Sequence, residues 1–381
     1  MSSAPRFPMT REAACARLAG FASGMGNAYT FGRNSDHGPD AEASTSVLSP
    51  YLRRRLVTEQ EVIEAALAAH GPEGAEKFIQ EVFWRSYFKG YLETRPSLWT
   101  EYQQLVVQGR NRLATESGLR RVFADAVAGN TGIDGFDDWA RELAANNWLH
   151  NHARMWFASI WIFTLRLPWA LGAEFFLRHL VDGDPASNTL SWRWVAGLHT
   201  RGKPYVARAE NIRRFTDGRY SPVGLDEDAT PLEGPELPAP LALERADPPP
   251  EGEVALLLHL DDLNAESLPL GQAKVVRVGG ILAHADGVVE PVRQADRDAM
   301  TDALQRAGRY FKCAAGLVEE GWADALPVAA AWAPVGPSAA VLPPCLRVRR
   351  EWDSLVWPHS TRGFFQVKAI IPRVLEQTGL A

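Results

Sequence analysis

The stretch from Asn147 to Trp194 constrains the fold more than any other part of the sequence. It begins as a predicted helix with aromatic and aliphatic residues on every side, and Asn151, Arg154 and Ser159 stand among them. A helix that is apolar all round is buried. Because a buried guanidinium without a partner is costly, we expect an anionic group beside Arg154.

The spacing indicates what surrounds this arginine. One stripe of the helix carries residues at positions i, i+3, i+4 and i+7, namely Trp148, Asn151, His152 and Met155. A second apolar helix follows and leads into a turn with two carboxylates, Asp182 and Asp184. The sequence leaves two interpretations open: an Arg154–Asp ion pair that only joins two helices, or a pair that belongs to a binding site.

Two motifs in this stretch resemble the flavin-binding domain of the DNA photolyase/cryptochrome family. The first is W-x-H-N-x-x-R-M, which starts at Trp148, and the second is D-G-D-x-A-x-N-x-x-x-W-x-W, which starts at Asp182. The resemblance extends over about residues 20–215. It implies an α-helical FAD-binding domain of photolyase type and FAD as the cofactor.

The resemblance also implies roles for individual residues. Those that would line the flavin are Trp148, Asn151, Arg154, Asp182, Asp184 and Asn188, the last facing flavin N5. Met155 and Trp194 would complete a pocket for a pyrimidine dimer, and Trp192 and Trp169 match the inner members of a Trp electron-transfer chain. The region around Arg112 offers no third member, so an exit through Trp161, Trp156, a Tyr or Trp99 is the alternative.

A cluster of hydroxyl residues precedes a second predicted helix, in the run T-S-V-L-S-P-Y-L from Thr45 to Leu52. Such residues commonly form an N-cap, and helix starts also bind phosphate. By the resemblance, the contacts to the FAD pyrophosphate would come from Tyr29, Thr45, Ser46, Val47, Leu48 and Ser49. For the three following arginines, Arg53, Arg54 and Arg55, we expect a solvated basic face, with a phosphate contact as the alternative.

The helix around Phe78 carries Glu81, Trp84 and Arg85 at i, i+3 and i+4, on one face. A Glu81–Arg85 pair beside a core tryptophan is one interpretation. The family resemblance implies another, in which Glu81 and Trp84 contact the thymine dimer and Arg85 lies near flavin and DNA phosphate, with Phe78 at the cofactor. Ser86 stands where the family has a second acid.

Composition divides the chain. Residues 221–252 are Pro-rich and acidic and read as a linker, so we predict a helical FAD-binding domain over 1–220 and a small α/β domain over 253–381. The predicted elements of the α/β domain are strands at 253–260, 274–278 and 326–332 and a helix at 297–310. Relatives usually begin with an α/β antenna-pigment domain, whereas this sequence starts in the flavin domain. The second domain is therefore either a permuted relative of the antenna domain or unrelated to it, and whether an antenna pigment binds stays open.

Charge and cysteine content bear on location and partners. Residues 1–220 hold 26 Lys and Arg against 23 Asp and Glu, and 221–381 hold 14 against 23, so only the first part suits a polyanion. Three scattered cysteines favour neither a disulfide framework nor a metal site. With no secretion signal and no apolar run long enough to span a membrane, we expect a cytoplasmic protein without a membrane partner.

By the resemblance, the expected activity is that of a photolyase-like lyase. Reduced FAD, excited by light, would repair cyclobutane pyrimidine dimers in UV-damaged DNA by electron transfer. The alternative is a cryptochrome-like blue-light receptor without repair, which acts through a protein signalling partner. Two departures bear on DNA binding: His152 stands where many relatives have Arg, and the tail over 205–219 is shortened.

Overall fold

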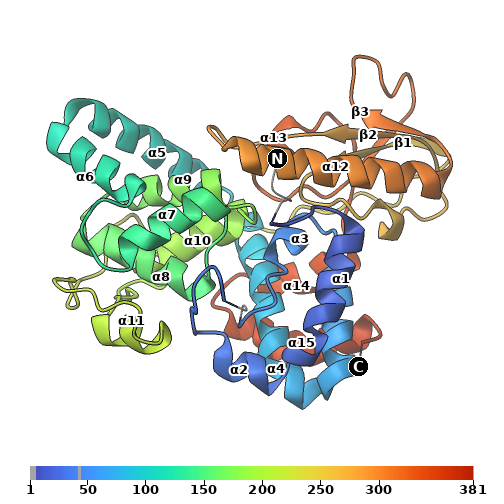
Figure 1. Ribbon diagram of the computed structural model, residues 1–381. Helices are drawn as coiled ribbons and strands as arrows, with labels where there is room; N and C mark the ends of the chain where they lie inside the picture. Colours follow the sequence, from blue (N-terminus) through green and yellow to red (C-terminus); the bar gives the residue numbers. More distant parts are fainter. Residues whose placement is uncertain (1–5, 42–43, 381) are drawn as a thin grey trace, which may run out of the picture. The chain divides into compact units, whose positions relative to one another are not determined.

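The chain forms two compact units that alternate along the sequence (Figure 1). The computed structural model describes residues 6–41 and 44–380. Unit 1 consists of Met1–Asn27, Ser46–Thr94 and Pro240–Ala381, and unit 2 of Ala28–Thr45 and Arg95–Ala239. The units therefore divide the chain differently from the predicted boundaries at 220 and 253, because the segment that contains Glu81 and Trp84 belongs with the α/β part.

Unit 1 combines helices with a parallel sheet. Its α-helices are α1 (Arg11–Phe21), α3 (Ser49–Arg53), α4 (Glu59–Glu93), α12 (Glu290–Phe311), α13 (Pro337–Val341), α14 (Glu351–Val356) and α15 (Phe365–Gln377). Three short 3-10 turns are η1 (Ala22–Gly24), η3 (Ala265–Ser267) and η4 (Trp357–His359). The longest element, α4, starts with a reciprocal cap in which Thr58 and Glu61 bond each other's backbone N–H. It bends at Gly71, whose φ of +65° and following proline interrupt the helical hydrogen bonds.

The sheet contains five parallel strands in the order β3-β2-β1-β4-β5. They are β1 (Glu253–His259), β2 (Lys274–Ile281), β3 (Ala314–Leu317), β4 (Val328–Ala331) and β5 (Leu346–Val348). Helix α12 runs along the sheet (Figure 1). The three predicted strands and the predicted helix are confirmed as β1, β2, β4 and α12. The short β3 and β5 were not predicted. The predicted fold class, helical with a smaller α/β part, is confirmed.

Unit 2 is helical. Its elements are α5 (Ser97–Thr115), α6 (Ser117–Ala128), α7 (Phe136–Asn146), α8 (Asn151–Ser159), the π-helical η2 (Ile160–Thr164), α9 (Trp169–His179), α10 (Pro185–Val195) and α11 (Ala209–Phe215), with α2 (Asn27–Gly32) at the change from unit 1. Trp156, Phe157 and Trp161 are fully buried. The prediction that the helix after Asn147 is buried is thus confirmed.

The predicted linker over 221–252 contains no helix or strand, but hydrogen bonds hold it in place. In unit 2, Leu232 N–H donates to the Ala196 carbonyl at 3.0 Å. In unit 1, Leu241 N–H donates to the Thr94 carbonyl at 2.8 Å. The segment is therefore an extended strap and not a free tether.

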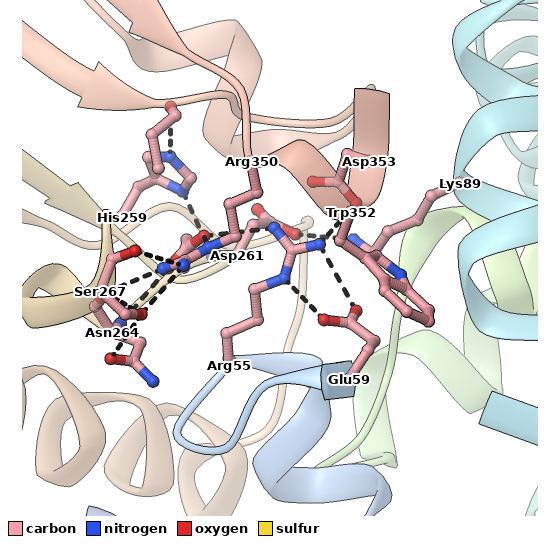
Figure 2. A network of polar contacts seen from close by, with 12 residues as sticks. Arg55, Glu59, Lys89, His259, Asp261, Asn264, Ser267, Arg350, Trp352 and Asp353 are labelled. Carbon is pink, nitrogen blue, oxygen red and sulfur yellow. Dashed lines mark hydrogen bonds and ion pairs between the residues drawn. The ribbon is translucent and has the colours of Figure 1, made fainter. Parts of the chain in front are cut away.

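A buried ion network joins the start of α4 to the strand ends of the sheet (Figure 2). Arg55 contacts Glu59 at 3.2 Å, Asp262 at 3.2 Å and Asp353 at 2.6 Å. Arg350 binds both carboxylate oxygens of Asp262, at 2.6 and 2.7 Å. These pairs explain why 46–94 and 240–381 form one unit, since separating them would leave buried charges unpaired.

The three consecutive arginines are not a solvated basic face, and that prediction is wrong. Arg53, Arg54 and Arg55 are all buried, and each pairs with an aspartate that follows a strand or lies on α12. Arg53 contacts Asp261 at 2.8 Å, for example. A charged side chain is buried only where such partners exist, and the partners lie more than 200 residues away in sequence.

We predict that Asp262→Asn lowers the free energy of unfolding by roughly 3–5 kcal/mol, because it leaves the buried Arg350 guanidinium without its carboxylate and removes one of the three carboxylates that contact Arg55. Urea unfolding followed by tryptophan fluorescence measures this. Burial alone would raise the pKa of Asp262, but Arg350 and Arg55 hold it at about 2. The stabilisation is therefore present above the ordinary value of 3.8 and lost as the pH falls through about 2.

The control is Glu253→Gln, which removes an exposed ion pair with Lys274 at 2.8 Å on the same sheet. Such pairs contribute about 0–1 kcal/mol. Equal losses in the two variants would contradict the stabilising role of the network.

Candidate functional site

Arg154 and Asp182 form the ion pair that the spacing predicts, inside unit 2. Arg154 donates to Asp182 Oδ2 at 2.8 Å and to the Leu149 carbonyl at 3.0 Å. Its guanidinium carbon lies 5.9 Å from the ring centroid of Trp148. The pair connects the start of α8 with the turn after α9, so the predicted ion pair is confirmed.

Three buried polar atoms around this pair have no hydrogen-bond partner among the described residues. They are Asp182 Oδ1, Asn147 Nδ2 and His150 Nε2. The Val181 N–H donates to the Asn147 carbonyl at 2.8 Å, so Asn147 lies close to Asp182, the residue after Val181. Burial lowers the pKa of His150 to about 4, so its ring is neutral at pH 7. Buried polar groups are normally satisfied, and this cluster offers an acceptor, a donor and an imidazole nitrogen.

Asp184 and Asn188 fix the next helix. Asp184 is the N-cap of α10 and accepts from Ser187 N–H at 2.9 Å. The Asn188 amide donates to the Ala173 carbonyl at 2.8 Å, which ties α10 to α9 and uses one of the two donors of that amide. Both residues therefore have structural contacts at the positions where the resemblance expects flavin contacts.

His152, the departure from the family's usual arginine, holds three parts of unit 2 together. Its ring stacks on Trp156 with centroids 4.3 Å apart. Nδ1 lies 2.9 Å from the Asn34 carbonyl and Nε2 lies 3.3 Å from the Tyr205 hydroxyl. Burial lowers the pKa of His152. The ring therefore packs as a neutral group beside the shortened tail.

The predicted electron-transfer tryptophans lie among other rings. Trp192 meets Trp161 edge-on at 6.3 Å between centroids. Trp169 lies 6.0 Å from Tyr102, which lies 5.1 Å from Trp99. The structure thus places Trp99, one of the alternative exits, in a series of rings that starts at Trp169.

The residues predicted for a dimer pocket are divided between the units. Met155 and Trp194 belong to unit 2, where Met155 is half-buried and Trp194 stacks on Tyr205 with centroids 5.5 Å apart. Glu81 and Trp84 belong to unit 1. Asn151, the first residue of α8, is exposed.

Trp84 has an aromatic partner that the sequence did not indicate. Phe364, just before α15, stacks on it with centroids 3.9 Å apart and planes 9° apart. The Tyr87 hydroxyl donates to the Arg362 carbonyl at 2.8 Å and fixes this turn. Phe364 is 7% exposed, whereas its neighbour Phe365 is 83% exposed. One face of the Trp84 ring is therefore covered by the chain itself.

The charged neighbours of Trp84 are paired along α4. Glu81 contacts Lys77 at 3.0 Å and Arg85 contacts Glu59 at 3.5 Å. Ser86, in place of the family's second acid, accepts from Trp352 Nε1 at 2.7 Å. Exchange of the acid for serine thus provides a partner for a buried indole.

The residues predicted to contact the FAD pyrophosphate are also divided between the two units. Tyr29 and Thr45 belong to unit 2, and Ser46, Val47, Leu48 and Ser49 to unit 1. Helix α3 starts at Ser49 with Leu48 as N-cap and without a side-chain cap hydrogen bond, so the N-cap interpretation of the hydroxyls is wrong. Val47 has a φ of +52°, a strained conformation for a β-branched residue. Phe78 is buried and faces Phe21 at 6.4 Å.

Comparison with known proteins gives matches to DNA photolyases. The family described as the FAD binding domain of DNA photolyase matches residues 78–222. The deoxyribodipyrimidine photo-lyase of Streptomyces griseus is 36% identical over 190 residues, covering 46% of this chain and 40% of its own length. The deoxyribodipyrimidine photo-lyase of Synechococcus is 32% identical over 176 residues, which cover 43% of this chain and 34% of the relative's length.

The solved structure of a class III photolyase from Agrobacterium tumefaciens is 26% identical with a TM-score of 0.46, and the alignment covers 55% of this chain and 43% of that one. The chain thus spans about two fifths of the length of the photo-lyases it matches.

Residues 78–222 match a flavin-binding domain. More specifically, they match the FAD-binding domain of the DNA photolyase family, with FAD as the cofactor. The Arg154–Asp182 cluster fits this group, because FAD presents hydroxyl and imide donors and carbonyl acceptors to the unpaired atoms of Asp182 and Asn147.

Membrane-spanning helices and metal-binding groups are both absent among the described residues. None of their helices is both long and apolar enough to cross a membrane. Nor do three or more of their His, Cys, Asp or Glu side chains gather in a way that would hold a metal ion.

We predict that Asp182→Asn weakens FAD binding roughly 10- to 100-fold, since it removes a charge-assisted acceptor worth about 1.5–3 kcal/mol. Titration of the apoprotein with FAD, followed by flavin fluorescence, measures the affinity.

Asp217→Asn is the control, because Asp217 is an exposed aspartate of unit 2 that pairs with His37 at 2.7 Å. Its FAD affinity should equal that of the unsubstituted protein. The same affinity in Asp182→Asn would remove this carboxylate from the FAD site.

Proposed function

We propose that this protein repairs cyclobutane pyrimidine dimers in UV-damaged DNA by light-driven electron transfer. The observation that carries the proposal is the Arg154–Asp182 cluster, with its unpaired acceptor and donor, inside a photolyase-type FAD-binding domain. The names of its relatives, deoxyribodipyrimidine photo-lyase, support the same activity. FAD, when bound in its reduced form, supplies the electron after it absorbs blue or near-UV light.

In this proposal, the residues of the chain bind the cofactor and hold their own polar groups in fixed positions. Arg154 holds Asp182 in place, so that Oδ1 keeps a fixed position for a hydrogen-bond donor of the ligand. Asn188 is held by its bond to Ala173 and presents a neutral amide near the cofactor. Fixed polar groups of this kind need no reorganisation when charge moves, which lowers the barrier to electron transfer.

In unit 1, the lesion would be contacted by Glu81 and Trp84, two positions that match the family. A flipped dimer loses its stacking in the duplex, and an aromatic wall returns about 1–3 kcal/mol per base. The Glu81 carboxylate is a half-buried group of α4 and would accept a hydrogen bond from a thymine imide. Residues 199–219 carry six Lys and Arg against two acidic residues, which suits a phosphate backbone.

A blue-light receptor without repair activity is the second candidate. The observation that favours it is the stack of Phe364 on Trp84, which covers one of the surfaces a dimer would use. In that case, light absorption by the flavin would change the binding of a protein partner. The two candidates differ in whether a thymine dimer is a substrate.

We predict that Glu81→Ala lowers the rate of dimer repair roughly 10- to 100-fold while FAD stays bound, because it removes a hydrogen bond to a charged group worth about 1.5–3 kcal/mol. Recovery of thymine absorbance in a dimer-containing oligothymidine under blue light gives the rate. Glu73→Ala, an exposed glutamate of the same helix, is the matched control. Normal repair in Glu81→Ala would argue against the assigned pocket.

We predict that Phe364→Leu raises the affinity for a dimer-containing oligothymidine roughly 3- to 10-fold, since it frees the Trp84 face for base stacking worth about 1–3 kcal/mol. Fluorescence anisotropy of a labelled oligonucleotide in the dark measures the affinity.

The matched control is Phe365→Leu, which changes the adjacent exposed ring. If neither substitution changes the affinity, the covered face of Trp84 does not take part in lesion binding.

A further inference from the structure

The sheet of unit 1 ends in an unprotected edge strand. Strand β3 pairs with β2 on one side, and no other strand of the described residues pairs with it. All four of its residues, Ala314 to Leu317, are exposed, and none is charged or proline. Natural sheets usually protect such an edge with lysine, proline, a bulge or a covering segment. An edge without these devices is a template for pairing with another strand.

The surroundings of β3 are shaped for a second strand. A groove of about 450 Å³ lies between the last turns of α12 and β3, with Leu304, Gly308 and Ala315 in its lining. Two large apolar side chains lie exposed here: Tyr310, on the last turn of α12, is 59% exposed, and Leu317, the last residue of β3, is 57% exposed. An added strand would bury both, so the edge offers apolar contacts as well as backbone hydrogen bonds.

The charges beside β3 identify the occupant. Exposed Arg309 and Lys312 precede the strand, and exposed Glu319 and Glu320 follow it. When two such strands pair antiparallel about a two-fold axis, the basic start of each lies beside the acidic end of the other. This arrangement is self-complementary, as an isologous dimer interface requires. A parallel pairing would instead set like charges together.

We propose that two copies of this chain associate through antiparallel pairing of their β3 strands, which joins the two sheets into one. The pairing satisfies the free edge of each strand and buries Leu317 and Tyr310 of both copies. Lys312 of each copy then faces Glu319 and Glu320 of the other. The interface is independent of the FAD-binding domain and of the proposed repair activity.

Sedimentation equilibrium of the full chain with FAD bound tests the proposal. We expect a dimer at micromolar concentrations for the unsubstituted protein. Leu317→Lys should produce monomers, because it places a charge on the pairing edge. Val107→Lys, which changes an exposed apolar residue of unit 2, should remain dimeric. An unsubstituted protein that sediments as a monomer would overturn the proposal.

A charge exchange separates this interface from a general effect on folding. Lys312→Glu sets like charges together and should weaken the dimer about tenfold, as expected for a change of about 1.4 kcal/mol. Combining it with Glu319→Lys and Glu320→Lys reverses the charges of all three residues that face each other across the interface and should restore the dimer. Failure of the triple substitution to restore the dimer would show that the edges do not pair antiparallel.

Circular dichroism and flavin absorbance of every variant show that it is folded and loaded. A Leu317→Lys protein that keeps both signals and still sediments as a dimer would also overturn the proposal.

Discussion

The buried contact between Arg55 and the aspartates of the sheet is the interaction on which unit 1 depends. One guanidinium contacts Glu59 at the start of α4, Asp262 in the loop after β1, and Asp353 on α14. Charges taken out of water are tolerated only with this degree of pairing. The network therefore connects residues that lie up to 298 positions apart in the sequence. Helix α4, which carries Glu81 and Trp84, belongs to the same unit.

The network also occupies the part of the sheet where open α/β folds usually bind ligands, outside the carboxyl ends of the strands. Asp261 and Asp262 follow β1 and Arg350 follows β5, and their polar atoms bind Arg53, Arg55 and each other (Figure 2). A relation between 253–381 and an antenna domain stays a prediction. The charged groups at the strand ends already serve the protein's own packing.

Sequence reasoning succeeded where the signal is local. The helical spacing from Trp148 to Met155, and the turn at Asp182, predicted the Arg154–Asp182 pair, because each half of the pair lies in a short motif. It failed where partners are distant. Nothing near Arg55 indicates Asp353, and nothing near Trp84 indicates Phe364, since contacts across hundreds of residues leave no periodicity in either segment. The three arginines were therefore misread as a surface feature, and the unit boundaries differ from the compositional ones.

The central claim is that this chain is a light-driven flavoprotein that acts on pyrimidine dimers. The most direct measurement is the absorption spectrum of the purified protein, followed under anaerobic blue light with a reductant and then with dimer-containing oligothymidine. We expect flavin bands that bleach under light, followed by recovery of the thymine absorbance. Flavin that bleaches without thymine recovery would contradict repair, and a spectrum without flavin bands would contradict the flavin site itself.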